Sequence, residues 1–171
     1  SGDWSSDVCS SDLALGAAQR LGNRWLVSVK LSWLDWSRAF RASTLTATRP
    51  DTALAPASIS NRTSLNWRDQ YVIALGAAYQ ATPQTTILGG VNYGRNPIPN
   101  ETTNPLLAAF AEWHATLGII HKFNDRWQGS LGLEYDFART VTYTNPEFPL
   151  GVNAQARGEI IGVHFGVGRR W

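Results

Sequence analysis

Three histidines are the residues of this sequence best able to do chemistry. His114, His121 and His164 lie far apart along the chain, and none has further ligands at the spacing of a metal site. Alternation of polar and apolar residues places His114 and His164 on the polar side of predicted strands, and His121 beside a short turn. We therefore expect these side chains to line a polar interior, and we predict no metal site.

A hydrolytic site is the second chemistry that the residue types would allow. Ser130, Glu134 and His164 fall on polar faces of predicted strands, and a serine hydrolase needs a nucleophile beside a base. No enzyme motif surrounds them, so an enzyme is not predicted. Gly89-Gly90 and Gly166-Val167-Gly168 precede no helix, so they are not phosphate-binding loops, and no cofactor is expected.

The composition limits the class of protein. The chain has 171 residues, of which 43% are hydrophobic and 16% charged, with a formal net charge of +2. The charged fraction lies well below the roughly 25% of a soluble domain, and no apolar run approaches the roughly 18 residues of a transmembrane helix. One domain is expected from the length. The basic residues are scattered without stacking aromatics, which argues against a nucleic-acid partner.

The first 13 residues differ from the rest of the chain. They show no periodicity and include Cys9, the single cysteine. Because Asp3 to Leu13 can be encoded by the end of a common short-read sequencing adapter, we expect residues 1–13 to be an unstructured, adapter-derived segment and residues 14–171 to be the protein itself. A Ser/Asp-rich surface tail is the alternative. Without this segment no cysteine remains, which excludes disulfides and thiol catalysis, and the natural N-terminus is expected upstream.

From Leu13 onward, apolar residues recur with a period of two, which is typical of strands. In the last segment Phe165 lies on the apolar row and His164 on the polar row. In the segment before it, Leu131 and Val141 lie on the apolar row. About seven strands are predicted, at residues 13–20, 25–33, 71–79, 85–93, 112–123, 127–143 and 161–171.

The predicted connections are short at one end of the strands and long at the other. Short turns at 21–23, 81–84 and 124–126 alternate with polar loops at about 46–68, 95–111 and 144–157. Aromatic residues cap the apolar rows, with Trp25, Trp127 and Trp171 beside the short turns and Trp33, Tyr71, Tyr93 and Trp113 toward the long loops. These features predict an all-β, antiparallel, up-and-down transmembrane β-barrel, in which every backbone group must pair. A soluble β-sandwich or lipocalin-like barrel is the alternative.

Four stretches carry recognisable motifs. The first, Trp33-Leu34-Asp35-Trp36-Ser37-Arg38-Ala39-Phe40, is similar to a W-x-D-W-S-R-F segment late in a long strand, and the third, Tyr93-Gly94-Arg95-Asn96-Pro97-Ile98-Pro99-Asn100, is similar to a loop opening. The second is Trp67-Arg68-Asp69-Gln70-Tyr71 with Ala74-Leu75-Gly76-Ala77-Ala78-Tyr79, and the fourth is Trp113-His114-Ala115-Thr116-Leu117-Gly118. In this order and at this spacing they resemble the C-terminal half of the FadL/TodX (OmpP1) family of outer-membrane transport proteins.

The resemblance implies a 14-stranded barrel with an N-terminal plug, in the outer membrane of a Gram-negative bacterium. With about seven strands present, we expect a C-terminal fragment that forms an open curved sheet with two unpaired edges. The implied function is passive uptake of hydrophobic compounds, either long-chain fatty acids or aromatic hydrocarbons, with the ligand leaving the barrel sideways. A general-diffusion or structural barrel without a specific ligand is the alternative.

The ligand contacts expected from this resemblance are Trp36, Phe40 and His114, as lumen-facing residues of the upper strands. Outer-membrane lipid and lipopolysaccharide are implied partners, and the C-terminal Trp171 is expected to be recognised by the outer-membrane assembly machinery. Arg169 occupies a position on the apolar row, where its long stem can reach the membrane interface.

Overall fold

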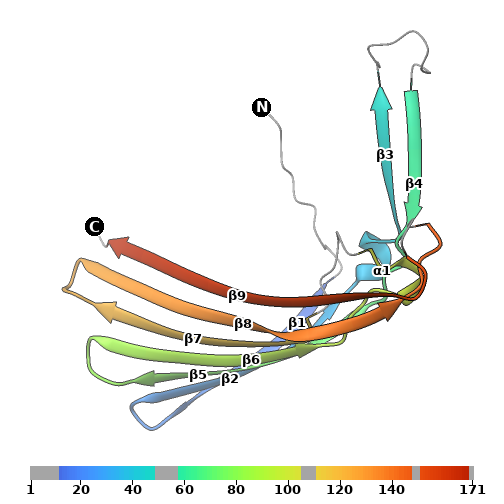
Figure 1. The fold of residues 1–171 in the computed structure, drawn as a ribbon. Coiled ribbons are helices and arrows are strands. Elements are labelled where there is room, and N and C mark those ends of the chain that lie inside the picture. The colour runs from blue at the N-terminus through green and yellow to red at the C-terminus, as the bar shows by residue number, and fades with distance from the viewer. Residues whose placement is uncertain (1–11, 49–57, 105–110, 148–150, 170–171) are drawn as a thin grey trace.

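The computed structural model describes residues 12–48, 58–104, 111–147 and 151–169. Figure 1 shows one curved sheet, with a separate hairpin that extends away from one end of it. The strands are β1 (Leu13–Leu21), β2 (Trp25–Leu34), β3 (Ala42–Thr48), β4 (Ser58–Ser64), β5 (Gln70–Gln80), β6 (Thr85–Gly94), β7 (Trp113–Lys122), β8 (Trp127–Tyr143) and β9 (Ala154–Arg169). Two helical turns, α1 (Trp36–Ala39) and η1 (Asn100–Thr102), lie in the connections. The predicted all-β fold is confirmed.

The sheet has seven strands in the order β1-β2-β5-β6-β7-β8-β9, and each neighbouring pair is antiparallel. Among the described residues β1 and β9 each have a neighbour on one side only, so the sheet is an open arc, as expected (Figure 1). The turns at one end are short. The turn between β1 and β2 uses Gly22, whose φ of +63° glycine adopts without steric cost.

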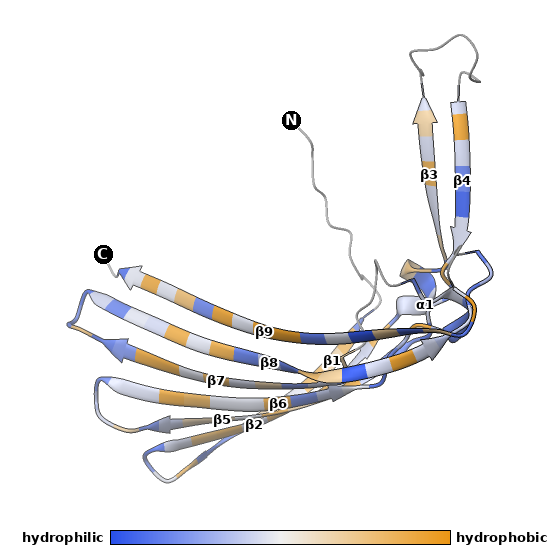
Figure 2. Cartoon of the chain, in the orientation of Figure 1, coloured by the Kyte–Doolittle hydropathy of each residue, from blue (hydrophilic) through white to orange (hydrophobic). Residues whose placement is uncertain are grey.

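The register puts the odd-numbered residues of this sheet on one face and the even-numbered residues on the other. Leu31 pairs with Ile73, and Leu133 pairs with Val163, so the apolar rows of neighbouring strands coincide. Figure 2 shows the resulting alternation along each strand. The odd face is apolar and exposed, to 88% for Phe165. A continuous apolar face of this size is the surface that a barrel presents to lipid.

Aromatic residues border the apolar face at both ends, as predicted. At the end with short turns, the ring centroids of Trp25 and Tyr79 lie 4.7 Å apart. At the other end, Tyr93 and Trp113 make the same contact at 4.7 Å. Arg169 does occupy the apolar row, where it pairs with Trp127 and its guanidinium carbon lies 5.4 Å from the centroid of that ring. Trp171 lies outside the described residues.

Two predicted connections are wrong because they contain strands. The loop predicted at 46–68 is largely the hairpin of β3 and β4, and β9 begins at Ala154, inside the loop predicted at 144–157. The hairpin has no apolar row to mark it, since Leu45 faces Asn61 across the strands and is 75% exposed. Its pairing is sustained by β-branched residues and backbone hydrogen bonds rather than by a core.

Two predicted boundaries also need correction. Leu13, assigned above to the unstructured leading segment, is the first residue of β1 and pairs with Trp33. The segment from Trp36 is the helical turn α1 and not the end of a long strand. The carboxylate of Asp35 accepts a hydrogen bond from the amide of Arg38, at 3.3 Å, and this cap ends the strand by starting a helix.

A β-bulge changes the side-chain directions in β8. The register shifts between Asp136 and Arg139, so one extra residue of β8 lies opposite β9. Beyond the bulge the odd residues turn to the polar face, where Val141 and Tyr143 are buried at 8% and 4% exposure. The prediction that Val141 belongs to the apolar row is therefore wrong, because alternation alone does not reveal an inserted residue.

The densest packing lies among the connections at this end and not within the sheet. Thr103 is fully buried, and its hydroxyl donates to the carbonyl of Pro99 at 2.9 Å. The side-chain amide of Asn145 donates to the carbonyl of Thr103 at 3.0 Å, and Leu65 and Ile98 are buried beside them. Among the described residues, no helix is long and apolar enough to cross a membrane.

Candidate functional site

A pocket of about 230 Å³ lies on the polar face of the sheet, at the end with the long connections. It is lined by Trp36, Trp67, Gln70, Pro97, Ala111, His114, Asp136, Gly158, Glu159 and Ile160. A larger hollow of about 420 Å³ lies at the opposite end, between the turns around Gln84 and Asp125. That hollow is bordered mainly by polar turn residues, so of these two the first has the largely apolar wall that small-molecule sites have.

Three aromatic side chains pack together at the pocket, and we call Trp36, Phe40 and Trp67 the aromatic cluster. Trp36 and Trp67 line the pocket, and Phe40 supports them from behind. Phe40 stacks on Trp67 with ring centroids 4.5 Å apart and an interplanar angle of 20°. Trp36 meets both rings edge-on, at 5.4 Å from Phe40 and 5.9 Å from Trp67. The capped turn α1 sets this arrangement, because it places Trp36 and Phe40 one helical turn apart on the same side.

The indole N–H of Trp36 forms its hydrogen bond with a protein side chain and needs no partner inside the pocket. Its indole N–H donates to Oε1 of Gln70 at 3.0 Å, and Nε2 of Gln70 donates to the carbonyl of Arg95 at 2.9 Å. Because its N–H is already paired, this half-buried indole presents a purely apolar ring to a ligand. The same bonds tie the aromatic cluster to β5 and to the loop that follows β6.

That loop folds over the mouth of the pocket. The carbonyl of Pro97 accepts a hydrogen bond from the amide of Arg68 at 2.9 Å. The carboxylate of Glu112 accepts from the amide of Asn96 at 2.8 Å and forms an ion pair with Arg139, just beyond the bulge. The bulge in β8 therefore has a clear consequence: it turns Arg139 toward the loop that covers the pocket.

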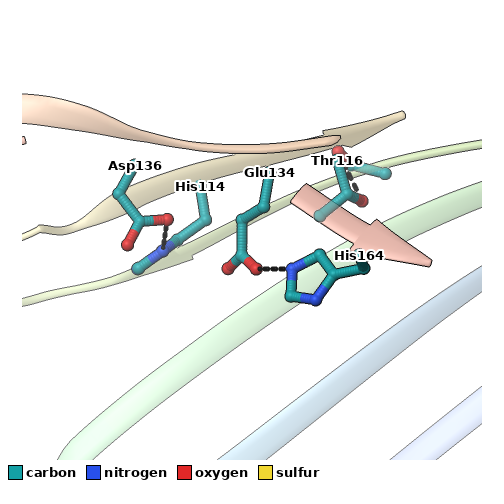
Figure 3. A network of polar contacts seen from close by, with 6 residues as sticks. His114, Thr116, Glu134, Asp136 and His164 are labelled. Carbon is teal, nitrogen blue, oxygen red and sulfur yellow. Dashed lines mark hydrogen bonds and ion pairs between the residues drawn. The ribbon is translucent and has the colours of Figure 1, made fainter. Parts of the chain in front are cut away.

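The opposite wall is polar, and we call His114, Glu134, Asp136 and His164 the histidine–carboxylate cluster. Nδ1 of His114 lies 2.6 Å from Oδ1 of Asp136, and Nε2 of His164 lies 2.9 Å from Oε2 of Glu134. Figure 3 shows the two pairs side by side, with Thr116 nearby. His114 and Asp136 line the pocket itself, and their side chains are only 27% and 10% exposed.

One acidic group at this end has a shifted pKa. Asp69 lies in the connection before β5, and its pKa is lowered by a hydrogen bond from the Ser37 side chain and then by one from the Ser37 backbone amide, at 3.1 Å. Asp69 thus fastens the turn α1, and with it Trp36, to the start of β5 through an ionised carboxylate.

The structure brings together two of the three ligand contacts expected from the sequence. Trp36 and His114 line the same pocket, whereas Phe40 stacks on Trp67, does not line the pocket and is 36% exposed. Trp36 and Phe40 lie in and beside α1 and not on an upper strand, which corrects that part of the expectation.

Other pocket residues were not anticipated. Trp67 and Gln70 belong to the second motif quoted above, so their shared segment was the available indication. Asp136 is the direct cross-strand partner of His114, a pairing that only the register of β7 and β8 reveals. Trp67, Gln70 and Asp136 all line the pocket.

The histidines raised two chemical hypotheses in the sequence, a serine hydrolase site and a metal site. Ser130 pairs with Gly166 across the strands, and within the part of the chain that the structure describes no hydrogen bond joins it to His164, which contacts Glu134 instead. Conversely, the ligand atoms of His114, Glu134 and Asp136 all lie within 4.8 Å of one another. These three residues come from two strands and meet without any sequence motif, so the sequence contained no sign of this grouping. That the chain has no metal site stays a prediction.

Comparison with known proteins places these observations in context. The family described as outer membrane protein transport protein (OMPP1/FadL/TodX) matches residues 12–109. A comparison with curated proteins gives no match.

Solved structures share the fold. The Pseudomonas putida toluene transporter TodX is 18% identical, with a TM-score of 0.67 over 94% of this chain and 34% of its own. The Ralstonia pickettii toluene transporter TbuX is 15% identical, with a TM-score of 0.64 over 92% of this chain and 33% of its own. A Pseudomonas aeruginosa FadL homologue is 18% identical, with a TM-score of 0.60 over 91% and 33%. The chain thus spans about a third of the length of these structures.

Proposed function

Because the chain belongs to the family of outer membrane transport proteins that includes OMPP1, FadL and TodX, we propose that it forms part of a barrel for passive uptake of hydrophobic compounds across the outer membrane. The family match covers more than half of the chain. The seven-stranded arc, with one apolar face and one polar face, supplies the wall of such a barrel.

The observation that carries this proposal is the pocket on the polar face of the sheet. A barrel that passed only water and ions would need no apolar pocket in its lumen. Here Trp36, Trp67, Pro97 and Ile160 form an apolar surface beneath a loop that is fixed by hydrogen bonds. An apolar molecule that leaves the external lipid layer gains free energy by entering such a pocket, because its apolar surface is removed from water.

The dimensions and charge of the pocket favour aromatic hydrocarbons over long-chain fatty acids. An apolar cavity of about 150 Å³ is large enough for benzene, so about 230 Å³ accommodates one substituted ring. A long acyl chain would extend beyond it. The carboxylate of Asp136 also lines the pocket, and it would repel the carboxylate of a fatty acid.

The complete protein is proposed to close this arc into a 14-stranded barrel, with residues 14–171 as its C-terminal part and residues 1–13 as adapter-derived sequence. The apolar face then contacts outer-membrane lipid and lipopolysaccharide. We also propose that Trp171, which lies outside the described residues, is recognised by the assembly machinery of the outer membrane. No enzymatic role is proposed, since the family consists of transport proteins.

Uptake by living cells tests this function. A Gram-negative host that lacks its own transporter for the compound would express the complete protein, and accumulation of radiolabelled toluene and of oleate would be followed over time. We expect faster toluene accumulation than in cells with an empty vector. The rival function, a general-diffusion barrel, predicts no gain in toluene uptake and free ion conductance in planar bilayers.

A further inference from the structure

His114 and Asp136 of the histidine–carboxylate cluster line the pocket, but an apolar molecule would leave the polar atoms of the cluster unused. It contains two carboxylates and two imidazoles on the polar face of three neighbouring strands (Figure 3). Such donors are the side chains that bind divalent transition-metal ions in proteins.

The sheet register makes three of these side chains converge. His114 on β7 lies directly opposite Asp136 on β8. Glu134 precedes Asp136 by two residues, so both carboxylates point to the same face of β8. As a result, one nitrogen of His114 and one oxygen of each carboxylate lie within 4.8 Å of one another.

The fourth member of the cluster holds one of these carboxylates in place. His164 comes from β9, and its Nε2 lies 2.9 Å from Oε2 of Glu134. A glycine provides the space for this contact, because a Cβ atom at Gly162 would lie 3.2 Å from Nε2 of His164 and 3.4 Å from Cβ of Glu134. Metal-binding carboxylates are commonly oriented by such a second hydrogen bond.

The observed separations are compatible with a metal ion after a small movement. Bonds of about 2.0–2.2 Å to nitrogen and oxygen would place the ligand atoms about 3.5 Å apart in a tetrahedral site. Glu134 is 35% exposed and has a flexible side chain, so it can close the remaining gap. His114 and Asp136 already lie 2.6 Å apart and would open slightly around the ion.

We propose that His114, Glu134 and Asp136 bind a divalent transition-metal ion such as Zn²⁺ on the inner wall of the barrel, with His164 as the residue that positions Glu134. A divalent ion offsets the charge of the two neighbouring carboxylates, and its fourth position faces the lumen. Because His114 and Asp136 also line the pocket, the ion sits at the border of the pocket and offers a polar contact there.

Zinc titration of the complete protein tests this site. The protein, folded in detergent micelles and treated with a chelator, would be titrated with Zn²⁺ in a calorimeter. We expect one ion per chain, with affinity reduced at least 100-fold in His114→Gln and Asp136→Asn and by about tenfold in His164→Gln. His121→Gln is the matched control, because His121 lies on the apolar face, where it contacts Thr85, and this variant should bind like wild type.

Two results would overturn the proposal. One is the absence of saturable zinc binding by the wild-type protein. The other is equal affinity in His114→Gln, Asp136→Asn and His121→Gln. A measurement on wild-type protein alone guards against variants that fail to fold: X-ray absorption at the zinc edge should show scattering from one imidazole ring, and its absence contradicts the site. None of these readouts involves toluene uptake, so they fail or succeed independently of the proposed transport.

Discussion

Nδ1 of His114 lies 2.6 Å from Oδ1 of Asp136, and the two residues face each other directly across β7 and β8. This pair joins the two strands at the level of the pocket, opposite the aromatic cluster. The side chain of Asp136 is only 10% exposed, so its carboxylate has lost most of its contact with water. The hydrogen bond with the His114 imidazole offsets the free-energy cost of that loss. The polar wall of the pocket is therefore part of the structure that holds the barrel wall together.

Removing one partner of this pair should destabilise the protein. Asp136→Ala leaves the imidazole of His114 without its acceptor in a half-buried position, which typically costs about 1–3 kcal/mol. The free energy of unfolding of the complete barrel in micelles, measured by urea titration, should fall by that amount. Asp125→Ala, in the exposed turn between β7 and β8, is the control and should have little effect. Equal stability of the two variants would contradict this role for Asp136.

Glu112 should control the loop over the pocket. Its carboxylate accepts from the amide of Asn96 at 2.8 Å and pairs with Arg139, while its side chain is only 11% exposed. In Glu112→Ala we expect hydrogen exchange at the Asn96 amide to be about 10- to 100-fold faster, since a hydrogen bond to a charged group contributes about 1.5–3 kcal/mol. Glu112→Gln keeps an acceptor for this amide and should retain most of the protection. Unchanged exchange in Glu112→Ala would refute the assignment.

The contact between Asp69 and Ser37 should depend on pH in a defined direction. The pKa of Asp69 is lowered from its ordinary value of 3.8, so the ionised form favours the folded contact. The stabilisation is complete above the unfolded pKa and is lost as the pH falls through the folded pKa, which places the change below pH 3.8. A ¹³C NMR titration of the Asp69 carboxyl should show this midpoint.

Ser37→Ala removes the largest cause of the shift and should move the Asp69 midpoint back toward 3.8. Ser60→Ala is the matched control, because the Ser60 hydroxyl contacts Thr46 in the separate hairpin. A wild-type midpoint at or above 3.8, or equal midpoints in the two variants, would show that Ser37 does not hold this carboxylate.

Alternation with a period of two was sufficient to predict the sheet. Seven strands, the short turns and the two aromatic borders follow from it, since lipid on one face and a polar lumen on the other demand opposite residue types at neighbouring positions. The hairpin of β3 and β4 escaped prediction because neither of its faces is apolar. The side chain of Val141 lies on the polar face and not on the apolar face, and this was not predicted, because a bulge inserts one residue without changing the composition.

The candidate site was only partly predictable. Trp36 and His114 could be chosen from motifs and from the polar row, but their common pocket depends on the turn α1 and on the bulge near Arg139. The convergence of His114 with Asp136 and Glu134 depends on which residues face each other across strands. A single sequence does not contain that register, because it is set by how the strands pair in three dimensions.

The chain of 171 residues on its own should associate with itself. The edges β1 and β9 expose backbone groups, and large apolar side chains such as Leu15 and Phe165 are exposed beside them. Sedimentation in mild detergent should show large oligomers, whereas the complete barrel, whose edges would be paired, should sediment as a single species. A monomeric, well-dispersed preparation of the isolated chain would contradict the open sheet.

Ligand binding in the pocket is tested most directly by the affinity of the complete protein for toluene in Trp36→Ala. Removing this ring deletes an apolar wall of the pocket, so we expect binding at least about tenfold weaker than wild type, as for other buried aromatic contacts. Trp113→Ala removes a tryptophan of the same size from the apolar face and should leave toluene affinity unchanged. Unchanged affinity in Trp36→Ala would contradict ligand binding in this pocket and the uptake function built on it.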